Sequence, residues 1–106
     1  MESTNYNVLE KLTNNFYMVV LDSLDDTYGG DILLPTLDDC DEYAKYVSNI
    51  ATENGDSYLV TFNEYVLTDD ELNELEYDIQ AFFDNMYDYN SEVVDSFIVG
   101  KKKNNI

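Results

Sequence analysis

The longest regular pattern of apolar and polar positions runs from Thr68 to Tyr89. Its apolar residues recur at spacings of three and four, which is typical of a helix with one face on a core; they are Leu72, Leu75, Ile79, Phe82, Phe83 and Met86. Thr68 followed by Glu71 is a capping-box pattern, and Asp69 and Asp70 suit the positive end of a helix dipole. The pattern predicts one continuous helix over this stretch.

Two further stretches have helical spacing. One begins after Thr36, carries acidic residues in its first turn and ends near Gly55, a usual residue after a helix end. Its apolar face comprises Leu37, Cys40, Ala44, Val47 and either Ile50 or Ala51. The other covers residues 4–13, with Val8, Leu9 and Leu12 on one side. We therefore expect a second main helix and a short helix near the N-terminus.

Four stretches rich in β-branched and aromatic residues predict strands. Residues 16–21, FYMVVL, are apolar at every position, as in a central strand that is covered on both faces. Residues 32–34 are expected to pair back on it as a hairpin across the loop 22–31. The others are residues 57–62 and 93–99, and the last is expected near an edge because polar residues interrupt it.

The predicted order of elements, α-β-β-α-β-α-β, indicates an α+β fold. We expect a sheet of about four strands with two main helices packed on one face. A length of 106 residues fits a single domain with its own core, and we place this acidic domain at residues 1–100. The basic tail at residues 101–106, KKKNNI, is expected to be disordered and solvated.

The charge of the chain limits the kinds of partner that it can bind. The 23 Asp and Glu residues against five Lys give a formal net charge of −18, while 44% hydrophobic residues are too many for a disordered acidic tail. Such a surface repels nucleic acid and anionic membranes and attracts basic proteins. We expect a basic protein surface as the partner, with no direct nucleic acid and no membrane, and the sequence leaves the oligomeric state open.

The residue types that most enzymes need are missing. There is no His and no Arg, which removes imidazole bases, imidazole metal ligands and the usual phosphate clamp. Gly29-Gly30 stands alone as a turn signal and belongs to no phosphate-binding loop, and no acidic cluster matches the calcium-loop spacing. We expect no enzymatic activity, no cofactor and no metal site. Catalysis by a carboxylate pair stays formally open because any two of the 23 acids can face each other.

The single cysteine and the hydropathy of the chain indicate a compartment. Cys40 has no second cysteine with which to form an internal disulfide, which fits a reducing environment, and we expect it to be a small buried apolar residue. No stretch reaches the about 18 apolar residues of a membrane span, and the N-terminus lacks the regions of a signal peptide. We expect a cytoplasmic protein.

The outer surface of the predicted helix 68–89 is the candidate partner-binding site. Asp70, Glu74 and Asp78 follow one another at spacings of four on this surface. Like charges so placed cost a helix a few tenths of a kcal/mol per pair, so keeping them suggests that the charge serves a partner. A helix of about 20 residues is about 30 Å long. A nucleic-acid strand carries a phosphate every ~3.4 Å, and the number of carboxylates along the predicted helix is similar to the number of phosphates along the same length. Tyrosines are favoured at interfaces. The predicted binding residues are Asp69, Asp70, Glu71, Glu74, Tyr77, Asp78, Asp84, Tyr87 and Asp88.

In size, extreme acidity and lack of catalytic residue types, the chain resembles the small phage-encoded DNA mimics, the antirestriction and anti-CRISPR inhibitors. The resemblance is one of composition over the whole chain. It implies a stoichiometric inhibitor that acts in the cytoplasm of the host cell. Its carboxylates would take the place of phosphates in the nucleic-acid channel of a host defence nuclease and block DNA binding by competition.

Two other classes of function fit the same composition. One is an immunity protein or antitoxin that neutralises a basic toxin or nuclease through an acidic helix, as barstar-like proteins do. The other is an acidic domain with no charge-dependent partner, in which the charge only keeps a small protein soluble.

Overall fold

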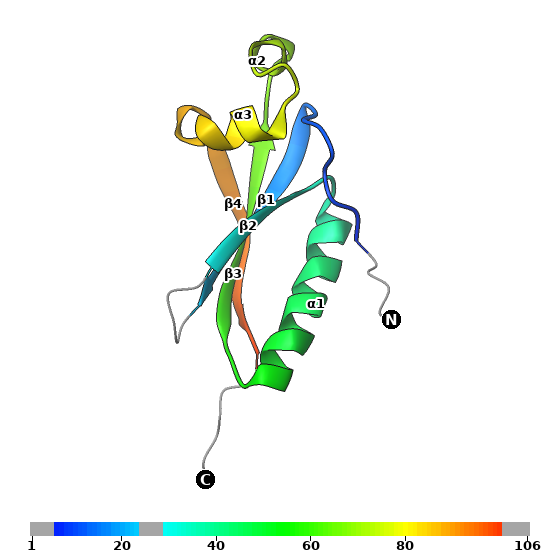
Figure 1. Cartoon of the computed structure of the whole chain (residues 1–106), viewed down its shortest axis with the longest axis vertical. Helices are drawn as coiled ribbons and strands as arrows, with labels where there is room; N and C mark the ends of the chain where they lie inside the picture. The colour runs from blue at the N-terminus through cyan, green and yellow to red at the C-terminus, as the bar shows by residue number, and fades with distance from the viewer. Residues whose placement is uncertain (1–5, 24–28, 101–106) are drawn as a thin grey trace.

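The computed structural model describes residues 6–23 and 29–100, which form a four-stranded antiparallel sheet with helices on both of its faces (Figure 1). The strand order is β2-β1-β3-β4, and each neighbouring pair is antiparallel. The expected α+β class and the four strands are confirmed. The elements are β1 (Asn15–Ser23), β2 (Gly29–Leu34), α1 (Leu37–Asn54), β3 (Tyr58–Val66), α2 (Asp69–Glu74), α3 (Ile79–Asp84), the 3-10 turn η1 (Met86–Asp88) and β4 (Ser91–Val99).

The strand predictions are confirmed, with longer bounds. β1 is a central strand that pairs with β2 as a hairpin on one side and with β3 on the other. β3 continues to Val66, four residues beyond the predicted end, because the register with β1 runs on to the pair Asn15 and Val66. β4 lies at an edge of the sheet, as its polar interruptions predicted. A register shift between Phe62 and Asn63 marks a bulge in its pairing with β3.

α1 covers one face of the sheet. The Thr36 side chain caps its N-terminus by accepting the N–H of Asp39 at 3.1 Å, and Gly55 ends it with a left-handed φ of 76°. Its buried side chains meet strand residues that share this face, among them Val19 and Phe62. The helix predicted after Thr36 is confirmed, and of the two alternatives in the last turn it is Ala51 that is buried while Ile50 is exposed.

A second core lies on the opposite face, toward the other end of the sheet. Phe16 and Met18 of β1 point to this face because they alternate with Val19, which contacts the α1 core. The residues that cover them come from the N-terminal segment, α2 and α3: Leu9, Leu12, Leu72, Leu75 and Phe82. The expectation that the main helices share one face is therefore wrong. β1 is apolar on both faces, so each face needs its own cover.

The continuous helix predicted over residues 68–89 is wrong. The capping box of Thr68 and Glu71 is present, but α2 ends at Glu74, and Glu76 and Tyr77 take left-handed φ values of 54° and 57°. The C=O of Tyr77 accepts the N–H of Leu12 at 3.1 Å. The predicted apolar residues of both short helices still pack on the second core. Helices this short depend on such tertiary packing for their stability.

The short helix predicted over residues 4–13 is also wrong for the described part, residues 6–13. The N–H groups of this segment bond outside it: Asn7 donates to the Asp39 carboxylate at 2.9 Å, and Leu9 donates to the C=O of Leu33 at 2.9 Å. An extended path lets Leu9 and Leu12 enter the second core. Residues 1–5, part of the predicted loop 22–31, and the tail 101–106 lie outside the described residues.

Replacing Asp39 by Asn is expected to lower the free energy of unfolding by about 2 kcal/mol at pH 7, because hydrogen bonds to a buried charge are lost. Asp39 is buried and accepts bonds from the Thr36 hydroxyl at 2.6 Å and the Asn7 N–H at 2.9 Å. The bond from Thr36, helped by those from Asn7, lowers the pKa of Asp39 although burial opposes this.

A lowered folded pKa gives stability that is present above the unfolded value of ~3.9 and is lost as the pH falls through the folded pKa. The difference between Asp39→Asn and the wild type should therefore shrink in urea denaturation below about pH 4. An equal difference at every pH would show that the charge of Asp39 contributes nothing.

Candidate functional site

The acidic residues predicted as a binding site lie at one end of the molecule, in the segment 69–89 that holds α2, α3 and η1 (Figure 1). We name this segment the acidic end. Asp69 and Asp70 occupy the first turn of α2, and Asp69 accepts a hydrogen bond from the Asn14 amide at 3.1 Å. Glu71 accepts the N–H of Thr68 at 2.9 Å. Asp69 and Glu71 thus serve the local structure, while Asp70 points to solvent.

The break after α2 separates the remaining predicted residues. Tyr77 lies in the break, with Lys11 Nζ 5.8 Å from its ring centroid. Asp78 is the N-cap residue of α3 but makes no side-chain cap bond, although its carboxylate lies near the helix N-terminus. Asp84 ends α3 and accepts the Gln80 amide at 3.0 Å. The break removes the regular row of Asp70, Glu74 and Asp78 from one helix face. The comparison of one continuous helix with a nucleic-acid strand therefore no longer applies.

The fold nevertheless gathers carboxylates from separate elements around one phenol. Burial first raises the pKa of Tyr89, and the charges of Glu74, Glu71 and Asp88 raise it further. Glu74 belongs to α2 and Asp88 to η1, so charges from two separate elements act on the same phenol. Tyr89 itself stacks on Phe82 with ring centroids 5.9 Å apart and is partly buried against the second core. Tyr87 is 93% exposed and is the tyrosine available for contact.

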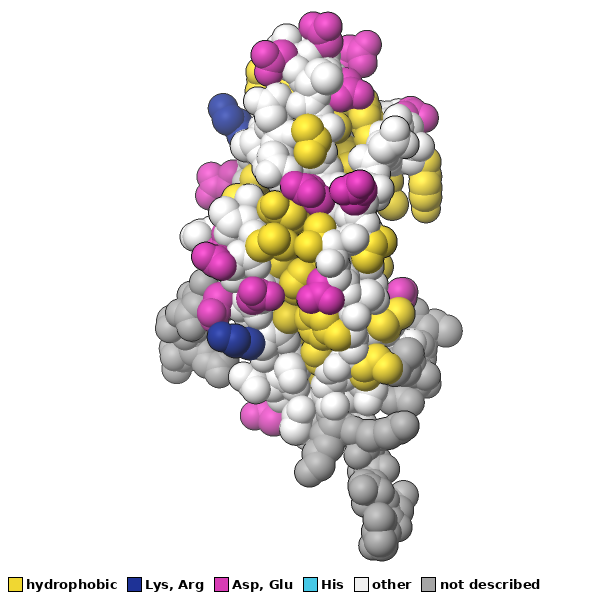
Figure 2. Space-filling view, turned by 180° about the vertical axis from the view of Figure 1, so that it is seen from behind, with side chains coloured by type: hydrophobic (Ala, Val, Ile, Leu, Met, Phe, Trp, Pro, Cys, Tyr) yellow, Lys and Arg dark blue, Asp and Glu magenta, His cyan; other side chains and the backbone are white. Residues whose placement is uncertain are grey.

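The carboxylates of the described residues are almost unneutralised. Lys11 and Lys45 are the only cationic side chains in the described ranges, and one ion pair forms there, between Lys45 and Glu42 at 3.3 Å. Only Asp39 among the described acids is buried. The molecule extends 55 × 29 × 20 Å, and Figure 2 shows acidic side chains along its whole length on the side of the β4 edge. The acidic surface therefore reaches well beyond the predicted site.

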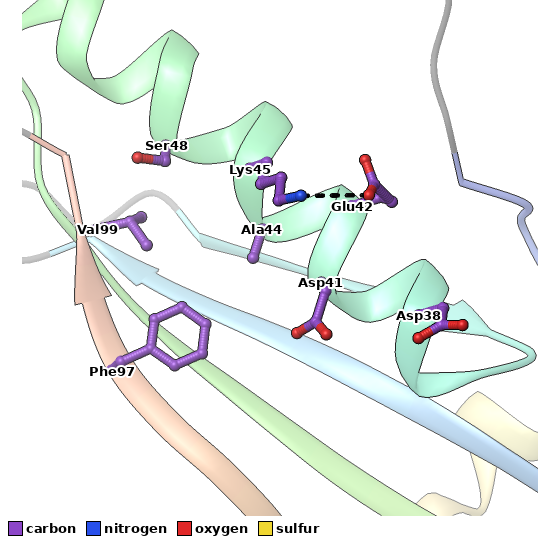
Figure 3. Close-up of a pocket in the computed structure, with 8 residues that line it drawn as sticks. All are labelled: Asp38, Asp41, Glu42, Ala44, Lys45, Ser48, Phe97 and Val99. Atoms are coloured by element: carbon purple, nitrogen blue, oxygen red, sulfur yellow. Dashed lines mark hydrogen bonds and ion pairs between the residues drawn. The ribbon is translucent and has the colours of Figure 1, made fainter.

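A groove between α1 and β4 was not predicted from the sequence. It has a volume of about 680 Å³, and its carboxylates come from α1 while its apolar floor comes from β4 (Figure 3); the lining residues are Asp38, Asp41, Glu42, Ala44, Lys45, Ser48, Phe97 and Val99. The acids of the first turns of α1 were visible in the sequence. The strand that lies beside them is brought there only by the sheet order.

Nucleophilic chemistry at Cys40 is disfavoured by its surroundings. The thiol is fully buried, and burial together with the charges of Asp41 and Asp39 raises its pKa to about 12. The expectation of a small buried apolar residue is confirmed. Among the side chains that the structure describes, no group of three or more Cys, Asp or Glu residues is arranged to hold a metal ion.

No family model matches the chain, and neither a curated protein nor a solved structure is significantly similar to it. Within the described ranges, every helix is too short or too polar to span a lipid bilayer.

Proposed function

We propose that the protein is an acidic DNA mimic that binds the basic nucleic-acid channel of a host defence nuclease, of the kind that anti-CRISPR and antirestriction inhibitors block. It has no enzymatic activity and no cofactor of its own, and it prevents DNA binding by competition. The observation that supports this most is the density of unneutralised carboxylates along an elongated body.

The magnitude of this charge is comparable with that of a nucleic acid. A net charge of −18 over a length of 55 Å corresponds to about one charge per 3 Å, against one phosphate per ~3.4 Å along a DNA strand. This similarity in charge per unit length is a property of the whole molecule and does not require a straight helix. A channel lined with Lys and Arg would attract either polyanion, so the protein and DNA would compete for it.

The acidic end is the part of this surface that we assign to the closest contact. Asp70, Glu74 and Asp88 are exposed there, and Tyr87, the residue before Asp88, is exposed as well. Carboxylates form short, charge-assisted hydrogen bonds with Lys and Arg, while an exposed tyrosine ring can add apolar contact area. The remaining carboxylates would raise the association rate by long-range steering, an effect that salt screens.

The test is a pull-down with the tagged protein from a lysate of the cells in which it acts, at about 50 mM and about 500 mM salt, since screening is strong at the higher value. We expect capture of a nucleic-acid-binding enzyme at low salt, and its release by high salt or by excess duplex DNA. The purified partner should then lose DNA binding at one equivalent of the protein, as measured by fluorescence anisotropy of labelled DNA.

Two outcomes would contradict the proposal. A captured partner that duplex DNA does not displace would favour the immunity-protein or antitoxin class. No salt-sensitive partner at all would favour the acidic domain whose charge serves solubility alone.

A further inference from the structure

β4 is an edge strand of unusual length and composition. It spans the nine residues Ser91–Val99, and within the described part of the chain no strand pairs with its outer side. Edge strands are ordinarily short or protected, because their unpaired N–H and C=O groups are a template for another strand. Here Val93, Val94 and Ile98 are exposed as well. Figure 2 shows apolar side chains gathered on this side of the molecule, with acidic ones above them and between them.

The N–H of Ser96 is a backbone donor on the outer side of β4, where a side chain of the same strand now accepts it. Thr61 and Ser96 face each other in the register, and their hydroxyl oxygens are 3.3 Å apart. Such close side chains are typical of the antiparallel pairs whose N–H and C=O groups point away from each other. In agreement, the N–H of Ser96 donates to the carboxylate of Asp95 at 2.9 Å. A neighbouring strand could take over this donor and release the carboxylate.

The two faces beside β4 differ in chemistry. Phe97 and Val99 lie on the face of α1 and form the floor of the groove that α1 lines (Figure 3). In this groove Glu42 pairs with Lys45 at 3.3 Å, while Asp38 and Asp41 have no cationic partner among the described residues. Val93 and Ile98 lie on the opposite face, because they pair with Asn63 and Leu59. Side chains of an added strand would alternate between these faces. One set would meet carboxylates, and the other set would meet valine and isoleucine.

We propose that β4 accepts an extended segment of a partner protein as a fifth strand, and that lysine or arginine alternates with apolar residues in this segment. The charge disfavours the other obvious occupant, a second copy of the chain. Pairing two β4 edges would bring Glu92 and Asp95 of one molecule against those of another, each molecule with a net charge of −18. Like charges that face each other across strands are destabilising, whereas lysines there form pairs.

This inference goes beyond the proposed function because it concerns recognition of a peptide backbone and requires no mimicry of DNA. Binding at β4 would depend on hydrogen bonds between backbones, while binding at the acidic end would depend on charge. The two are tested with different ligands, so that either can fail without the other.

The test uses a nine-residue peptide in which lysine and valine alternate, titrated calorimetrically into the protein of residues 1–106. Two analogues carry N-methyl groups, one at every lysine amide and the other at every valine amide, so that each analogue blocks one edge of the peptide. Strand addition uses a single edge. We expect one analogue to bind at least about tenfold more weakly than the parent and the other to bind nearly as well.

Variants of the protein test the same contact by changing β4 instead of the peptide. Ser96→Pro removes the outward N–H at an edge position where proline is tolerated, and Ser96→Ala is its control because it keeps that N–H. We expect Ser96→Pro to weaken peptide binding at least about tenfold and Ser96→Ala to leave it unchanged. Circular dichroism and the melting temperature show whether both variants fold.

Several results would overturn the inference. They are no binding of the parent peptide, equal binding of the parent and both analogues, and unchanged binding by a folded Ser96→Pro variant. A dimer of the wild type in analytical ultracentrifugation that Ser96→Pro dissociates would assign the edge to a second copy. If Ser96→Pro fails to fold, the peptide analogues alone decide.

Discussion

Replacing Phe82 by alanine is expected to lower the free energy of unfolding by about 3–5 kcal/mol, a large part of the stability of a domain of this size. Phe82 is fully buried and contacts rings from two strands, with centroid distances of 5.2 Å to Phe16 and 4.9 Å to Tyr65, both edge to face. Deleting the ring removes its apolar burial and leaves a cavity between α3 and the sheet. Urea denaturation followed by circular dichroism measures the change.

Tyr87→Ala is the matched control for this substitution. It removes an aromatic ring from the same end of the molecule, but the ring is 93% exposed, so the expected change is within about 0.5 kcal/mol. A similar loss from both variants would mean that α3 is not held by the second core. Because Tyr87 belongs to the proposed contact surface, the same variant should weaken partner binding without weakening the fold.

The second large effect is expected at the acidic end. Replacing Asp70, Glu74 and Asp88 by Asn, Gln and Asn removes three charges with little change of shape. Each charge pair made with a basic partner at a desolvated contact is worth more than about 1 kcal/mol, so affinity for the captured partner should fall by about 100-fold. The melting temperature should stay the same or rise slightly, because repulsion between carboxylates is relieved. Calorimetry and thermal denaturation measure the two quantities.

A control with the same change of net charge separates a local site from diffuse attraction. The control variant combines Asp22→Asn, Glu53→Gln and Asp56→Asn. These three residues lie at the other end of the molecule, near the end of α1 and the start of β3 (Figure 1). We expect this variant to lose less than about tenfold in affinity, mainly through weaker steering. Equal losses from the two triple variants would show that total charge matters and that the acidic end is not a distinct contact.

Local signals were sufficient for most of the elements. The run FYMVVL has no polar position, which only a strand covered on both faces accommodates, and β1 is that strand. Thr36 and Gly55 set the ends of α1 through a side-chain cap and a left-handed residue, both of which act within a few residues. Position at an edge followed from the polar residues inside β4.

Local signals failed where a distant segment chose between two conformations of similar local energy. The stretch 68–89 contains no Gly or Pro to mark a break, yet Tyr77 adopts a left-handed φ and its C=O accepts the N–H of Leu12, 65 residues away. The N-terminal segment likewise gives its Asn7 N–H to Asp39 instead of forming a helical turn. Neither partner is visible in the sequence near the residue that it fixes.

For the candidate site, the sequence by itself determined the sign and the amount of charge, the lack of His and Arg, and which residues carry the carboxylates, because these are properties of composition. Only the tertiary structure decided which of them lie together. It broke the expected row on one helix, let the charges of Glu71, Glu74 and Asp88 act together on the pKa of Tyr89, and set the acids of α1 beside β4, an edge strand of the described sheet. The reason is that strand order and helix breaks are settled by contacts between residues far apart in the chain, and such contacts leave no periodic trace in the sequence.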